Sequence, residues 1–182
     1  MKRFLLAICV AVLSTGAYAQ DYYSDVMDEP EAGDWGIGFG LDLGFGSEKV
    51  TNFGIQVPRL QYYFHPRVRI EGSFNYFFKS SVNDLYDATD WDVDFDVHPY
   101  VIPMKYGLHV YPIVGLGLWH RKYTSVIEGT ADPDGAFRVG ANVGVGFQYD
   151  ITENIAANIQ YKYFITNDYG HSIFGLGLIY RF

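Results

Sequence analysis

Large apolar residues alternate with small or polar ones from Trp35 to Phe182, and this alternation constrains the fold more than any other feature. In residues 35–45 every odd position is large and apolar, and every even position is Gly or Asp. Successive side chains of a β-strand point to opposite faces, so a period of two predicts a strand with one apolar face. The same rule recurs in seven further segments: 53–64, 68–78, 91–101, 108–123, 137–149, 155–164 and 172–182.

About eight such segments predict an all-β fold, a transmembrane antiparallel up-and-down β-barrel. Each segment is long enough for the tilted strand that crosses a bilayer, and an even number of strands suits a closed meander. The connectors 65–67, 103–107 and 150–154 are short, whereas 79–90 and 124–136 are longer and polar. This asymmetry is typical of barrels with tight periplasmic turns and longer outer loops.

The first nineteen residues predict a signal peptide. Lys2 and Arg3 precede an apolar stretch over residues 4–13, and Ala17-Tyr18-Ala19 forms a small-residue cleavage site. The apolar stretch is too short to cross a bilayer as a permanent helix. We therefore divide the chain into a signal peptide (1–19), a flexible acidic periplasmic segment (20–34) and an outer-membrane barrel (35–182).

Processing at this site changes both charge and thiol content. The formal net charge of −8 falls to −10 when Lys2 and Arg3 are removed, which argues against nucleic acid as a partner. Cys9, the single cysteine of the chain, also leaves with the signal peptide. The mature protein is therefore predicted to hold no disulfide, although its compartment would permit one.

The two faces of the predicted strands differ sharply in charge. The apolar parity carries no charged residue, whereas the opposite parity carries acids, bases and most glycines. A soluble lipocalin-like barrel would show the same alternation with its apolar face turned inward. Glycines on the polar face favour a narrow lumen instead, and aromatic residues near both strand ends favour two interfacial girdles.

The end of the last segment also points to the membrane. Residues 175–182 alternate up to Tyr180 and Phe182, and they resemble the C-terminal assembly signal of bacterial outer-membrane barrels. Residues 35–182 as a whole resemble the eight-stranded family of OmpX- and OmpA-like β-barrels. This resemblance implies residence in the outer membrane of a Gram-negative bacterium. It also implies contact with outer-membrane lipid and lipopolysaccharide, and handling by periplasmic chaperones and the barrel assembly machinery during biogenesis.

A row of acids on the segment 91–101 marks the candidate site. Alternate strand residues lie roughly 6.5 to 7 Å apart, too far for the whole row to bind one metal ion. Acids inside a narrow barrel need cationic partners, and several bases share the inward parity. We predict a lumen charge network of Asp42, Arg69, Glu71, Asp92, Asp94, Asp96, His98, Arg121, Arg138, Lys162 and Arg181.

Motifs for catalysis are weak. His171 and Ser172 are adjacent, but neighbouring residues of a strand point to opposite faces and cannot easily pair as base and nucleophile. No cofactor or metal site is predicted. The favoured function is a non-enzymatic barrel with a side-chain-filled polar lumen and a structural or surface-interaction role. The alternatives are a lipid A-modifying barrel enzyme, a small pore and a secreted lipocalin-like binder.

Three prolines interrupt the pattern. At Pro58 the apolar parity switches from odd to even positions, which predicts a β-bulge. Pro99 and Pro112 lie in or beside strands and lack the N–H that a ladder needs, so they predict bulges or broken ladder pairs.

Overall fold

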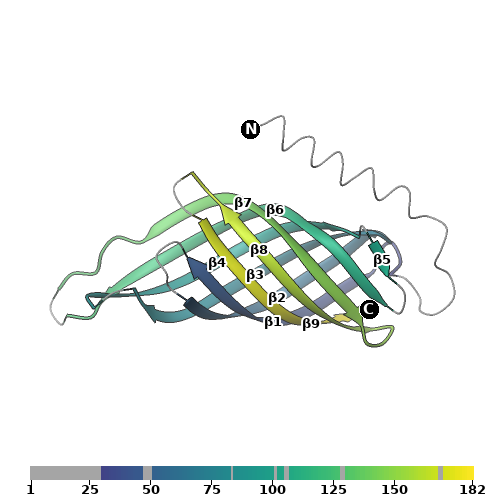
Figure 1. Ribbon diagram of the computed structural model, residues 1–182, viewed down its shortest axis with the longest axis horizontal. Coiled ribbons are helices and arrows are strands. Elements are labelled where there is room, and N and C mark those ends of the chain that lie inside the picture. The colour runs from purple at the N-terminus through teal and green to yellow at the C-terminus, as the bar shows by residue number, and fades with distance from the viewer. Residues whose placement is uncertain are drawn as a thin grey trace.

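The computed structural model describes residues 30–46, 51–82, 84–100, 102–104, 107–127, 130–167 and 170–182. The predicted signal peptide and residues 20–29 lie outside these residues. Nine antiparallel strands form one sheet that closes on itself (Figure 1). They are β1 (Trp35–Gly46), β2 (Thr51–His65), β3 (Val68–Ser81), β4 (Tyr86–Pro99), β5 (Ile102–Met104), β6 (Leu108–Ser125), β7 (Ala136–Asp150), β8 (Ile155–Ile165) and β9 (Gly170–Arg181).

Eight long strands make up the wall of the closed sheet, which confirms the predicted barrel. β1 pairs with both β2 and β9, and β4 pairs with β6, so no long edge is left open. The three-residue strand β5 does not add a ninth strand to the barrel wall. It takes up the pairing with β6 at Ile102↔Val110, below the point where β4 leaves β6 at Val97↔Val114.

The prolines lie where the ladders are irregular. Pro58 sits in a register shift of the β2–β3 ladder between Gln56 and Arg59, which confirms the predicted bulge. Pro99 ends β4, and the ladder to β6 stops before it. Pro112 faces the same gap from β6, while its other side keeps an unbroken ladder to β7. Two residues without an N–H thus share one interruption.

The apolar parity faces outward, as predicted. Phe95, Leu116 and Val139 are 62%, 66% and 73% exposed, whereas Asp94 and Asp96, which flank Phe95 along β4, are buried inside the barrel. Among the described residues there is no helix whose length and apolar character would let it cross a membrane.

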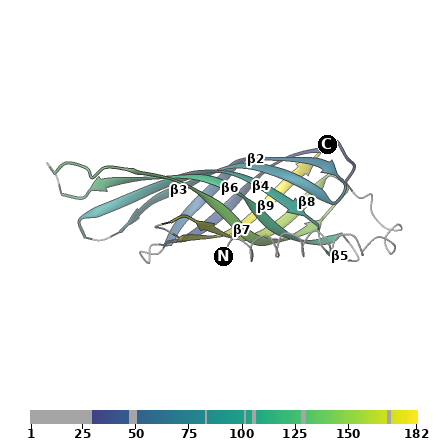
Figure 2. The ribbon, with the colours of Figure 1, turned by 90° about the horizontal axis from the view of Figure 1, so that it is seen from above.

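The two ends of the barrel differ. At one end, the long-hairpin end, β3 runs to Ser81, β4 begins at Tyr86 and β6 runs to Ser125 (Figure 2). Most of the connector predicted over 79–90 is therefore strand, and that prediction was wrong. Polar residues occupy both faces of the strands in this stretch, so the sequence shows no alternation of apolar and polar residues there, although Ala88 and Asp90 are buried in the lumen. The opposite end, the short-turn end, holds the turns after β2 and β7.

Candidate functional site

The lumen contains the candidate site. Its side chains form four successive layers, which we name after one member each: the Arg121, Lys162, Glu71 and Arg69 layers, from the long-hairpin end to the short-turn end. Each layer joins side chains from strands that are not neighbours in the sheet.

The Arg121 layer closes the long-hairpin end of the lumen. Arg121 donates two hydrogen bonds to the Asp90 carboxylate, both 2.8 Å long, and Asn52 donates a third of 3.1 Å. Trp119 lies beneath this pair, with the Arg121 guanidinium 4.9 Å from its ring centroid. A planar guanidinium matches a carboxylate in this bidentate geometry, so the layer is held in one orientation.

The Lys162 layer connects β8 to β4. The Lys162 Nζ atom lies 2.5 Å from Asp94 Oδ2 and 3.5 Å from Asp96 Oδ2. Asn142 donates hydrogen bonds of 2.9 Å to the same two carboxylates. Asn75 donates a 3.1 Å bond to Asp94 and also contacts Asp92. One cation and two amides therefore hold the acidic row of β4.

The Glu71 layer is centred on a carboxylate that accepts three hydrogen bonds. Arg59 donates to both oxygens of Glu71, at 3.0 and 2.9 Å, and Gln61 adds a bond of 2.5 Å. The same guanidinium donates a 2.6 Å bond to Asn158 Oδ1 on β8. Arg59 and Glu71 are each 1% exposed, so their attraction is little weakened by water.

The Arg69 layer closes the short-turn end. Arg69 donates to His98 Nδ1 at 3.0 Å and to the Tyr100 hydroxyl at 2.8 Å, and it also bonds Gln148. Its guanidinium carbon lies 4.5 Å from the centroid of the Tyr111 ring. The layer is thus a cation surrounded by rings and amides rather than an ion pair.

Two lumen glycines make space for the acidic row. Gly115 and Gly117 on β6 are paired with Asp96 and Asp94 on β4. A Cβ atom on Gly117 would lie 2.6 Å from Asp94 Oδ1, and one on Gly115 would overlap Asp96. Small residues here leave room for large charged ones, as the narrow lumen of an eight-stranded barrel requires.

The structure places the predicted network residues unevenly. Eight of the eleven lie in or beside the layers: Arg69, Glu71, Asp92, Asp94, Asp96, His98, Arg121 and Lys162. Asp42 is 2% exposed, and its Oδ2 atom has no hydrogen-bond partner among the described residues. Arg138 is half-buried beside Trp119, and Arg181 bonds the carbonyl of Glu153 in the β7–β8 turn. These last two occupy the rims.

Sequence reasoning missed Arg59, Gln61 and Asp90, although each is almost fully buried in the lumen. The signal for Arg59 and Gln61 was present, because the parity switch at Pro58 turns odd positions of β2 inward. Asp90 was missed because it fell in the predicted connector 79–90. Asn75 and Asn142 were not included in the predicted network because they are uncharged, yet they donate hydrogen bonds that bridge the acids of β4.

Among the described residues no metal cluster is built, and His171 and Ser172 do not form a hydrolytic pair. No group of three or more His, Cys, Asp or Glu side chains there is arranged to hold a metal ion. His171 is buried in the lumen, 1% exposed, whereas the Ser172 hydroxyl lies 3.1 Å from that of Tyr161 on the outer face. The adjacent His and Ser therefore point to opposite sides of the wall.

Comparisons with solved structures agree with the barrel. Ail, the attachment invasion locus protein of Yersinia pestis, is 21% identical with a TM-score of 0.57, covering 84% of this chain and all of that one. The N-terminal barrel domain of Pseudomonas aeruginosa OprF is 17% identical with a TM-score of 0.59, covering 81% of this chain and 97% of that one. Neisserial surface protein A is 14% identical with a TM-score of 0.61, covering 84% and 98%.

The sequence itself identifies the family. No curated protein matches the chain. Residues 5–182, however, match the outer membrane protein beta-barrel domain family. The chain is therefore a member of this family and a protein of the bacterial outer membrane, with its apolar face in lipid.

Proposed function

We propose that the protein is a non-enzymatic outer-membrane barrel with a lumen closed by side chains and a structural or surface-interaction role. The observation that carries this proposal is the stack of four layers across the bore. The interior of an eight-stranded barrel is only wide enough for side chains to fill, and here ion pairs and hydrogen bonds hold those side chains in place. The lumen is thus a polar core.

Ion conduction tests the plug. Folded wild-type protein in planar bilayers should show no large, steady single-channel current. In Asp94→Asn/Asp96→Asn, Lys162 loses both of its carboxylate partners, so stability should fall and leak should rise. Asp132→Asn on the exposed β6–β7 connection is the matched control and should match the wild type. Large, steady wild-type conductance would refute the plug and favour the small-pore alternative.

The enzyme alternative has a separate test. A lipid A-modifying barrel needs a nucleophile and a base together near one membrane rim, and His171 and Ser172 lie on opposite faces. We expect lipid A to keep its mass after incubation of lipopolysaccharide with the folded protein. A product of changed mass that disappears in His171→Gln would support the enzyme instead.

A surface role is supported by the long-hairpin end. Leu85, Val126 and Ile127 are about half exposed there, and the Val126 N–H bonds the Leu85 carbonyl at 2.9 Å, so two hairpin tips form one apolar patch. Outer-membrane barrels point their longer loops away from the cell, which places this patch outside. We propose that this patch contacts a protein partner, since exposed apolar patches are typical of protein–protein interaction surfaces.

Charge separates this patch from the ligand known for a structural neighbour. Ail has been solved with the heparin analogue sucrose octasulfate, a polyanion. The described hairpins here carry Asp84, Asp132 and Asp134 in exposed positions, against one exposed lysine on β6, Lys122, and Lys79, which is paired with Asp87 at 2.7 Å. We propose that the partner of this chain is not a sulfated polyanion, because those acids would repel it.

A further inference from the structure

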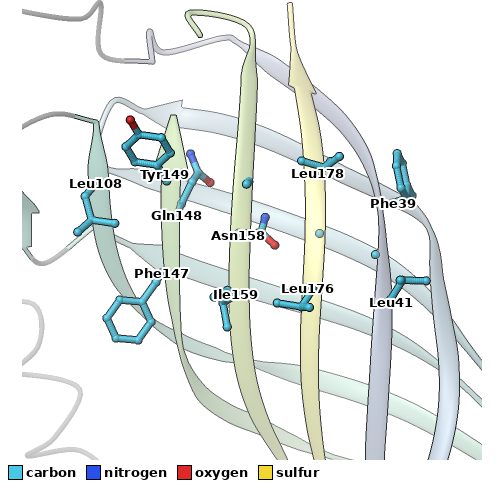
Figure 3. A pocket seen from close by; sticks show the side chains of 13 residues that line it. Phe39, Leu41, Leu108, Phe147, Gln148, Tyr149, Asn158, Ile159, Leu176 and Leu178 are labelled. Atoms are coloured by element: carbon cyan, nitrogen blue, oxygen red, sulfur yellow. The ribbon is translucent and has the colours of Figure 1, made fainter. Parts of the chain in front are cut away.

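The outer wall of the barrel is hollowed on one side. A shallow cavity of about 500 Å³ opens toward the membrane across β6, β7, β8, β9 and β1 (Figure 3). Its volume falls in the range of small-molecule sites, and nearly all of its accessible lining is apolar. Its outward-facing walls include Phe39, Leu41, Phe147, Tyr149, Leu176 and Leu178.

A small residue creates the hollow. Ala157 is paired with Tyr149 on β7 and with Leu178 on β9, so a methyl group stands between two large side chains. Gly40 and Gly177 are paired with each other further along the wall and contribute backbone only. The hollow is therefore fixed by the strand register, because the rigid ladders on both sides keep the larger walls apart.

We propose that this hollow binds one acyl chain of a phospholipid with an ammonium headgroup, drawn from the periplasmic leaflet of the outer membrane. A void in a lipid-facing wall loses dispersion contacts unless something fills it, and acyl chains are what surrounds this wall. The proposal rests on the family membership and the barrel's position in lipid.

Depth supports a lipid of the periplasmic leaflet. Ala157 is the third residue of β8, so it lies only roughly 7 Å along the strand from Ile155, the first strand residue after the turn between β7 and β8. Short turns of outer-membrane barrels face the periplasm. A chain in the hollow would therefore place its headgroup level with this turn.

Charge at the same rim selects the headgroup. Exposed acids lie at the short-turn rim of the strands that line the hollow: Glu153 between β7 and β8, and Glu31 before β1. The nearby Asp150 carboxylate is already paired with His109, 3.0 Å away. The cation closest to this rim, Arg181 on β9, is turned into the barrel with a side chain only 10% exposed, 4.0 Å from the same carboxylate, and the described turn cation Arg67 lies beyond β1, between β2 and β3. An ammonium group is attracted to such a rim, whereas a lipid with net negative charge is repelled.

Native mass spectrometry tests the proposal on the folded full-length mature barrel. The probes are phosphatidylethanolamine and phosphatidylglycerol with identical acyl chains. Wild-type protein should retain one phosphatidylethanolamine in preference to phosphatidylglycerol. Ala157→Phe should fill the hollow and reduce this retention roughly tenfold or more. Glu153→Gln should keep lipid binding but reduce the preference between the two headgroups.

The control is Ala141→Phe, another small outward residue on β7, paired with Leu116 and Ile165 and outside the hollow. It should retain lipid like the wild type. Equal retention by both Phe variants, or equal retention of the two lipids by the wild type, would overturn the proposal. So would a protein dimer that Ala157→Phe abolishes, since a second copy would then occupy the hollow. If Ala157→Phe fails to fold, Ala157→Leu replaces it under the same criteria.

Discussion

The Arg59–Glu71 pair shows how strongly one side chain of the lumen depends on another. Arg59→Met leaves the Glu71 carboxylate buried with Gln61 as its close donor. We expect this variant to lower the free energy of unfolding by about 3 kcal/mol or more, because an uncompensated buried charge is costly. Urea titration of the barrel in lipid vesicles measures the change.

The double variant Arg59→Met/Glu71→Met distinguishes the pair from simple packing. With both charges removed, most of the lost stability should return, since apolar residues of similar volume can replace a buried ion pair. If the double variant is as unstable as the sum of the two single variants, Arg59 acts through its packing and not through Glu71.

For single residues, the sequence predicted burial but not the pairing of charges. The parity of a residue predicts which face it occupies, so the burial of Asp94, Lys162 and Glu71 could be predicted. Which charges meet could not, because partners such as Arg59 and Asn158 are 99 residues apart and come together only through barrel closure. The bulge at Pro58 added a second obstacle, since it reverses the parity in the middle of β2.

Among the elements, β6 gives the clearest test of the lipid-facing side. Leu116 lies mid-strand, 66% exposed, between Phe95 on β4 and Ala141 on β7. Leu116→Arg should reduce membrane assembly, because a cation facing lipid at the midplane costs about 2 to 4 kcal/mol. Vesicle refolding followed by urea titration measures this. Leu85→Arg at the hairpin tip is the control and should assemble normally, and equal behaviour of the two variants would contradict the face assignment.

Strand boundaries were predictable only where the two faces differ. β1 and β8 alternate along their full length, and their predicted and observed bounds agree within two residues. The long-hairpin ends of β3 and β4 were missed because the alternation fades there. Their pairing at Ser81↔Asp87 is maintained by backbone hydrogen bonds, which form whatever the side chains are.

For the molecule as a whole, closure depends on the β1–β9 seam. Trp35 and Phe182 exchange backbone hydrogen bonds of 3.1 and 2.9 Å at its short-turn end. The Phe182 ring is 66% exposed and lies 6.3 Å, between centroids, from that of Tyr180. Its side chain therefore contributes little to the interior, and its exposed position suits recognition by another protein.

Deleting Phe182 should accordingly separate assembly from stability. Loss of two backbone hydrogen bonds at the edge of the seam costs roughly 1 to 3 kcal/mol, so the purified variant should still refold into vesicles. In cells it should accumulate outside the outer membrane, because Tyr180 and Phe182 together form the proposed signal for the assembly machinery. Membrane fractionation, with the heat-dependent gel mobility of folded barrels as readout, measures both quantities.

Phe182→Tyr keeps an aromatic ring and should assemble like the wild type. Normal cellular insertion of the deletion would show that the resemblance to an assembly signal has no function here, whereas failure to refold in vitro would assign Phe182 to the stability of the seam itself.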